Sequence, residues 1–104
     1  MISLKLTERI NELCNAIKNK QSSFPNCVEV YLFGSFLTKN YPNDIDVLIV
    51  YNDFNYGVID QLDKLMGYIE SVSNYPADVT ALTVSEMKET KFLERLNKNY
   101  IRII

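Results

Sequence analysis

Histidine and tryptophan are absent from this 104-residue chain, and only two cysteines, Cys14 and Cys27, are present. The cysteines lack the Cys-x-x-Cys spacing of a zinc or redox motif. Without histidine, the common zinc sites and Ser-His or Cys-His catalysis are excluded. We therefore expect two reduced, buried thiols, because a free cysteine usually behaves as a small apolar side chain.

Long apolar runs and dense basic clusters are missing as well. No apolar run approaches the roughly 18 residues needed to cross a membrane. The N-terminal stretch MISLKLTERI carries charges where a signal peptide needs an apolar segment. The net charge is −2, without a basic patch that would bind a long polyanion. These features predict a cytoplasmic protein that binds neither membranes nor long RNA or DNA.

The chain is 47% hydrophobic and shows no repeat, linker or low-complexity segment, which predicts a single domain spanning residues 1–104. Asn52, Asp53 and Asn55 predict a turn. The expected fold class is α/β (α+β), a small mixed β-sheet with helices packed on it. From hydrophobic periodicity we expect helices at 4–20 and 57–73, strands at 27–33, 44–51, 77–83 and 100–104, and one or two short helices within 84–99.

Two carboxylates, Asp44 and Asp46, stand at the start of the strand DIDVLIVY, where burial of charge is costly without a partner. Side chains alternate along a strand, so the two point to the same face, with Cα atoms about 6.6 Å apart. Carboxylate oxygens are ligands that Mg²⁺ prefers, and Mg²⁺ commonly completes its shell with water and substrate phosphates. The pair predicts a site for Mg²⁺ with a bound nucleotide.

Gly34 and Ser35 follow the preceding strand, CVEVYLF. A glycine lets the backbone approach a phosphate closely, and a helix that starts there can offer N–H groups to it. Taken alone, Gly-Ser is usually an ordinary turn, and Asp-x-Asp is often a solvated strand start. The order strand, Gly-Ser, short connection, Asp-x-Asp, buried strand favours a functional site over these simpler interpretations.

These motifs resemble those of the minimal nucleotidyltransferase (MNT) family of the DNA polymerase beta-like superfamily. The resembling residues are Gly34-Ser35, Asp44-Ile45-Asp46 and Asp78, and the similarity extends over almost the whole chain. It implies a polymerase beta-like nucleotidyltransferase fold and transfer of a nucleoside monophosphate from ATP or another NTP to a hydroxyl. Many relatives carry an arginine and a second glycine after Gly-Ser, where this chain has Phe-Leu-Thr-Lys.

The resemblance also suggests a role for each site residue. Asp44, Asp46 and Asp78 would be the catalytic and metal-binding residues, with two Mg²⁺ ions stabilising the attacking and leaving oxygens. Asp78 could also take the proton of the acceptor hydroxyl. The nucleotide would be bound by Gly34, Ser35, Thr38 and Lys39, although a solvated loop charge is the simpler interpretation of Lys39.

Three functions fit this resemblance. The favoured one is an antitoxin that transfers AMP to a tyrosine of a helical HEPN toxin, its partner in a hetero-oligomer. The second is a nucleotidyltransferase acting on a small molecule such as an aminoglycoside, whose enzymes usually add a helical acceptor-binding domain. The third is a catalytically silent antitoxin that blocks its partner by contact alone.

The aromatic residues fall into two groups. Tyr31 and Phe33 share a face of one strand and are expected in the core. Four other tyrosines are expected in connections around the site, where one of them could stack on a base or meet a partner. They are Tyr41, Tyr51, Tyr56 and Tyr75.

Overall fold

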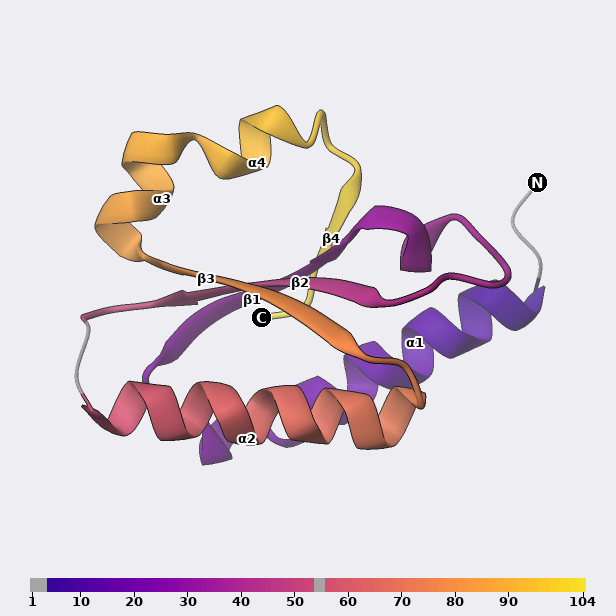
Figure 1. Cartoon of the computed structure of the whole chain (residues 1–104), viewed down its shortest axis with the longest axis horizontal. Helices are drawn as coiled ribbons and strands as arrows, with labels where there is room; N and C mark the ends of the chain where they lie inside the picture. Colours follow the sequence, from indigo (N-terminus) through magenta and orange to yellow (C-terminus); the bar gives the residue numbers. More distant parts are fainter. Residues whose placement is uncertain (1–3, 54–55) are drawn as a thin grey trace.

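A computed structural model describes residues 4–53 and 56–104 and contains a mixed four-stranded sheet in the order β3-β2-β1-β4 (Figure 1). The strands are β1 (Cys27–Phe33), β2 (Ile45–Tyr51), β3 (Ala77–Thr83) and β4 (Tyr100–Arg102). β1 pairs antiparallel with both β2 and β4, whereas β2 and β3 run parallel. The predicted α/β class with a mixed sheet is confirmed.

Helices cover both faces of the sheet (Figure 1). α1 (Leu4–Asn19) and α2 (Tyr56–Ser73) lie on one face, and the short α3 (Val84–Thr90) and α4 (Phe92–Arg95) lie on the other. Two 3₁₀ turns, η1 (Gln21–Ser23) and η2 (Gly34–Leu37), flank β1. Within the described residues, no helix is long and apolar enough to cross a membrane.

The main core lies between the sheet and the α1/α2 layer. Alternation along β1 sends Val30 and Leu32 into this core, where both are fully buried. Apolar residues at helical spacing on α1 meet them, because positions three and four apart share one face of a helix. Among these helical residues are Leu6, Ile10, Leu13 and Ile17.

A second, smaller core lies under α3 and α4, on the opposite face. Tyr31 is buried there, and half-buried Phe33 packs against it, so the prediction that both belong to the core is confirmed. Tyr31 makes an edge-to-face contact with Tyr100, and Phe33 makes one with Phe92, each with ring centroids 5.5 Å apart. These contacts cover one end of this face.

The predicted elements are present, with small differences at their ends. α1 ends at Asn19, α2 begins at Tyr56, and β2 begins at Ile45, each one residue from the predicted boundary. β4 ends at Arg102 rather than at residue 104. The Asn55 part of the predicted turn lies outside the described residues.

Candidate functional site

Three aspartates meet where β1 ends and β2 and β3 begin. In the parallel β2–β3 ladder Asp46 lies directly beside Asp78, and Asp44 precedes β2 by one residue. One carboxylate oxygen from each of the three lies within 4.8 Å of the others. The structure therefore brings together all three acidic residues that the sequence singles out, which we call the aspartate cluster.

The cluster occupies the sheet face opposite α1 and α2. On β1, Phe33 pairs with Asp46, and Phe33 packs on the α3/α4 side. Asp44 and Asp46 are half-buried and Asp78 is exposed, so the carboxylates are partly desolvated yet open to a ligand. This combination suits a site that takes up an ion from solvent.

The electrostatics of the cluster are unfavourable without a cation. Burial raises the pKa of Asp46, and the neighbouring charges of Asp44 and Asp78 raise it further. Among the described residues, no lysine or arginine forms an ion pair with any of the three. A divalent cation would remove this repulsion, and a set of oxygen ligands is what Mg²⁺ prefers.

Gly34 is fitted closely against the cluster. Its φ is +77°, in the left-handed region, and a Cβ placed on it would lie 2.0 Å from Oδ2 of Asp46. That position therefore needs glycine both for its backbone conformation and for the space that the Asp46 carboxylate occupies. The role of the Gly-Ser motif is thus partly to make room for an acidic side chain.

The chain after Gly34 turns sharply through η2. Ser35 is half-buried, and its carbonyl oxygen accepts the N–H groups of Thr38 at 3.1 Å and Lys39 at 2.8 Å. Thr38 and Lys39 have exposed side chains just past the turn. These residues lie in the connection between the Gly-Ser motif and the cluster, and their contact with a nucleotide stays a prediction.

A pocket of about 580 Å³ opens beside Gly34. Leu37 and Thr38 line it from the turn, and Lys98 and Tyr100 line it from the chain entering β4. Its volume is in the range of small-molecule sites. Lys98 was not predicted as a site residue, because no local pattern distinguishes it from other surface lysines.

Arg9 of α1 is a second residue that the sequence did not single out. Its guanidinium donates hydrogen bonds to the carbonyl oxygens of Phe36, Lys39 and Asn40, each at 3.0 Å. The signal in the sequence is faint: a charged residue next to Ile10 at the margin of the apolar face of α1.

The tyrosines expected around the site have different environments. Tyr51 is the last residue of β2, in agreement with the predicted strand 44–51, and is buried, so the expectation that it lies in a connection around the site is wrong. Tyr75 contacts the ring of Phe36 edge-to-face at 5.9 Å between centroids. Tyr41 is 91% exposed. The side chain of Tyr56 lies outside the described residues.

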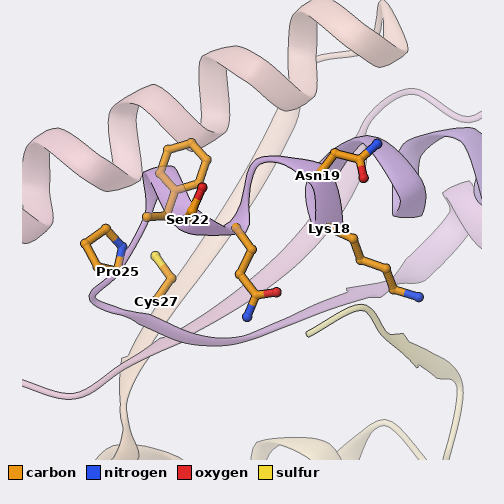
Figure 2. A pocket seen from close by; sticks show the side chains of 7 residues that line it. Lys18, Asn19, Ser22, Pro25 and Cys27 are labelled. Atoms are coloured by element: carbon orange, nitrogen blue, oxygen red, sulfur yellow. The ribbon is translucent and has the colours of Figure 1, made fainter.

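A further pocket, of about 500 Å³, lies at the other end of β1 (Figure 2). Lys18 and Asn19 from α1 and Ser22, Pro25 and Cys27 are among its lining residues. Burial raises the pKa of the Cys27 thiol, which disfavours the reactive thiolate. Both cysteines are free; Cys27 is buried as expected, whereas Cys14 is only half-buried, so the expectation of a buried thiol is wrong for Cys14. No acidic residue is among the described residues that line the pocket.

The fold is similar to those of solved structures. A Sulfolobus solfataricus protein described as a candidate nucleotidyltransferase is 24% identical, with a TM-score of 0.51, over 97% of this chain and 87% of that chain. A chain from the complex of a tri-AMPylated Shewanella oneidensis HEPN toxin with MNT antitoxin is 16% identical, with a TM-score of 0.57, over 92% of this chain and 71% of that chain. A mutant of the toxin–antitoxin pair MntA–HpeT is 15% identical, with a TM-score of 0.59, over 88% of this chain and 72% of that chain. At these identities the likeness shows the fold alone.

The sequence comparisons identify the family. Comparison with curated protein sequences gives no match. The family described as "Nucleotidyltransferase domain" matches residues 10–104, which include the Gly-Ser turn and all three members of the aspartate cluster. This chain belongs to the nucleotidyltransferase domain family.

Proposed function

We propose that the aspartate cluster is the site at which the chain transfers a nucleoside monophosphate from an NTP to the hydroxyl group of an acceptor. The proposed nucleoside monophosphate is AMP. The observation that carries the proposal is the convergence of three carboxylate oxygens within 4.8 Å beside a glycine that a side chain could not replace. Strand register and a left-handed turn both contribute to this arrangement. An incidental group of surface acids would not require the fit between Gly34 and Asp46.

The cluster fits a divalent cation, because it offers carboxylate oxygens from two half-buried aspartates and one exposed aspartate, and no described lysine or arginine forms an ion pair with them. Asp44, Asp46 and Asp78 would hold Mg²⁺, and two ions are expected. When bound, the metal supplies charge stabilisation for the phosphoryl oxygens. Gly34 and Ser35, with Thr38 and Lys39 beyond them, would bind the phosphates.

The proposed reaction is an in-line displacement at the α-phosphorus. The acceptor oxygen forms a bond to that phosphorus, the bond to the bridging oxygen of pyrophosphate breaks, and pyrophosphate leaves. Asp78 is the most exposed member of the cluster and is best placed to accept the proton that the acceptor hydroxyl loses.

For the acceptor we propose a tyrosine of a helical HEPN toxin, which would make this chain an antitoxin. Support comes from structural neighbours that are toxin–antitoxin complexes, one of them with an AMPylated toxin. A net charge of −2 and an acidic cluster would also attract a basic surface on the partner, such as the one that a toxin acting on RNA needs to bind its substrate. We place the reaction in the cytoplasm, where Mg·ATP is available.

The direct test is co-purification with a helical HEPN-type protein, to be sought among the products of neighbouring genes, followed by incubation with Mg·ATP. Intact-mass spectrometry should show increments of about 329 Da on the toxin, one per AMP transferred. Asp78→Asn should lower turnover far more than nucleotide affinity, because its role is in the chemical step. If the chain fully inhibits the toxin while the toxin mass stays unchanged, AMP transfer is contradicted and the catalytically silent antitoxin is the function that fits. If the chain transfers AMP to an aminoglycoside and not to the toxin, the proposal of a protein acceptor is contradicted.

A further inference from the structure

Segment 36–40, which follows the Gly-Ser turn, is clamped by a single side chain. Nη2 of Arg9 donates to the carbonyl oxygens of Phe36 and Lys39, and Nη1 donates to that of Asn40, all at 3.0 Å. These bonds join residues that lie 27 to 31 positions apart in the chain. One planar guanidinium thus fixes three carbonyl groups of the segment.

The guanidinium is itself held in place by two aromatic rings. Its central carbon lies 4.5 Å from the ring centroid of fully buried Phe36 and 5.7 Å from that of Tyr75. Attraction between a cation and a ring face strengthens when the pair is shielded from water. Nε of Arg9 is also buried. Phe36 belongs to segment 36–40 and Tyr75 lies outside it, so the ring contacts of Arg9 join the segment to the chain before β3.

The segment is also held by Leu37, which packs against the main core. The side chains of Thr38, Lys39 and Asn40 are exposed, and Leu37 is half-buried. The backbone N–H groups of Thr38 and Lys39 bond to Ser35 within the same turn. Local bonds of this kind open easily unless tertiary contacts hold the turn to the body of the protein. Phe36 and Leu37 hold the start of the segment to the core, and the Arg9 hydrogen bonds extend that hold to Lys39 and Asn40.

Arg9 also contacts the other half of the site. Tyr75 lies three residues before Asp78, and the next residue, Pro76, accepts the backbone N–H of Ile45 at 2.9 Å. Ile45 stands between two members of the aspartate cluster. The Arg9 contacts therefore join the Gly-Ser turn to the segment that leads into β3.

We infer that Arg9 is a positioning residue for nucleotide binding, which holds segment 36–40 in the conformation that meets the phosphates. The inference rests on the proposed function and deepens it. A segment ordered in advance loses less conformational entropy when the ligand binds, so the clamp should raise nucleotide affinity without touching the nucleotide. Lysine cannot replace arginine here, because one ammonium group does not match three separate carbonyls in the way a planar fork does.

The test compares Arg9→Lys with Arg102→Lys, a matched change at an exposed arginine on β4. In Arg9→Lys, amide hydrogen exchange at Thr38 and Lys39 should accelerate about tenfold or more, with core strand amides unchanged. Calorimetry should show Mg·ATP affinity reduced about tenfold, whereas Mn²⁺ binding without nucleotide stays within about twofold. Arg102→Lys should match the parent in all three measurements.

Unchanged exchange and unchanged Mg·ATP affinity in Arg9→Lys would overturn the inference. An equal loss of Mn²⁺ binding would also overturn it, because the residue would then support the whole fold rather than the phosphate-binding segment. A parent chain that fails to bind Mg·ATP would count against the proposed function, while exchange at Thr38 and Lys39 would still decide whether Arg9 holds the segment. If Arg9→Lys does not fold, Tyr75→Leu removes the ring contact of the guanidinium that lies outside the segment and should accelerate the same two amides; no acceleration would contradict the clamp.

Discussion

At the scale of single residues, Gly34 determines whether the aspartate cluster can form. Gly34→Ala should cost about 1–2 kcal/mol of folding free energy from its left-handed backbone alone. The new Cβ would also displace the Asp46 carboxylate, which lies 2.0 Å from that position. We therefore expect a lower urea midpoint together with a loss of Mn²⁺ binding measured by calorimetry.

Gly67 provides the matched control for this change. It lies on α2, is exposed, and a Cβ on it would meet no atom within 4 Å. Gly67→Ala should stabilise the protein by about 0.5–1 kcal/mol, because alanine favours the helix. Metal binding should not change. If Gly34→Ala behaves like Gly67→Ala, the proposed fit between Gly34 and Asp46 is wrong.

Asp46 makes the folding stability of the chain depend on pH, and the direction of its raised pKa determines the sign of that dependence. Burial, with the charges of Asp44 and Asp78, raises its folded pKa above the ordinary value of 3.8. The folded state then binds more protons than the unfolded state between the two pKa values. The contribution of the Asp46 carboxyl to folding stability is fully present below its unfolded pKa and is lost as pH rises through its folded pKa.

Asp46→Asn should therefore stabilise the metal-free protein at neutral pH relative to the parent. Urea unfolding in the presence of a chelator measures this difference across the acidic range. The advantage of Asp46→Asn should shrink as pH falls through the raised folded pKa of Asp46 toward the ordinary value of 3.8, because the folded parent carboxyl becomes protonated over this range. A constant advantage at every pH, or none, would show that repulsion within the cluster is not the cause.

At the scale of elements, the end of α2 is tied to the start of β3 by one hydrogen bond. The backbone N–H of Ala77 donates to Oε2 of half-buried Glu70 at 2.9 Å. Ala77 immediately precedes Asp78, so this bond helps to fix the third carboxylate. Glu70→Ala should cost about 1–3 kcal/mol, because it leaves a partly buried donor without its acceptor.

Urea unfolding of three variants tests this role of Glu70. Glu70→Gln retains a side-chain oxygen and should recover most of the loss. Glu89→Ala, at an exposed position on α3, should change stability by less than about 0.5 kcal/mol. Equal effects of Glu70→Ala and Glu89→Ala would contradict the tie between α2 and β3.

The elements themselves were largely predictable, because apolar periodicity of two and of 3.6 is a local property of the sequence. The end of β4 was not. The N–H groups of Ile103 and Ile104 both approach the carbonyl oxygen of Val30, so the regular ladder stops at Arg102, a detail set by the partner strand.

The aspartate cluster was predictable for a similar reason. Alternation along a strand places Asp44 and Asp46 on one face, and the resemblance to known nucleotidyltransferases suggested Asp78. Arg9 and Lys98 were not predictable, since Arg9 acts on carbonyls at least 27 positions away and Lys98 lines a pocket assembled from separate segments. Contacts of this kind leave no local pattern.

At the scale of the whole molecule, one face of the sheet forms the main core and the other carries the aspartate cluster. One face is closed by α1 and α2 over the main core. The other is partly covered by α3 and α4, and the aspartate cluster lies on it where β2 and β3 begin. The described chain measures only 40 × 28 × 20 Å. We therefore expect a protein acceptor to dock on the cluster face and complete the site.

The central claim is that the aspartate cluster binds a metal–nucleotide complex. Titration calorimetry of Mg·ATP into the parent chain and into the Asp44→Asn/Asp46→Asn double variant tests it most directly. We predict that the parent binds, that a chelator abolishes the binding, and that the folded double variant binds at least about 100-fold more weakly because two oxygen ligands have lost their charge. Equal affinity of the double variant and the parent would contradict the claim.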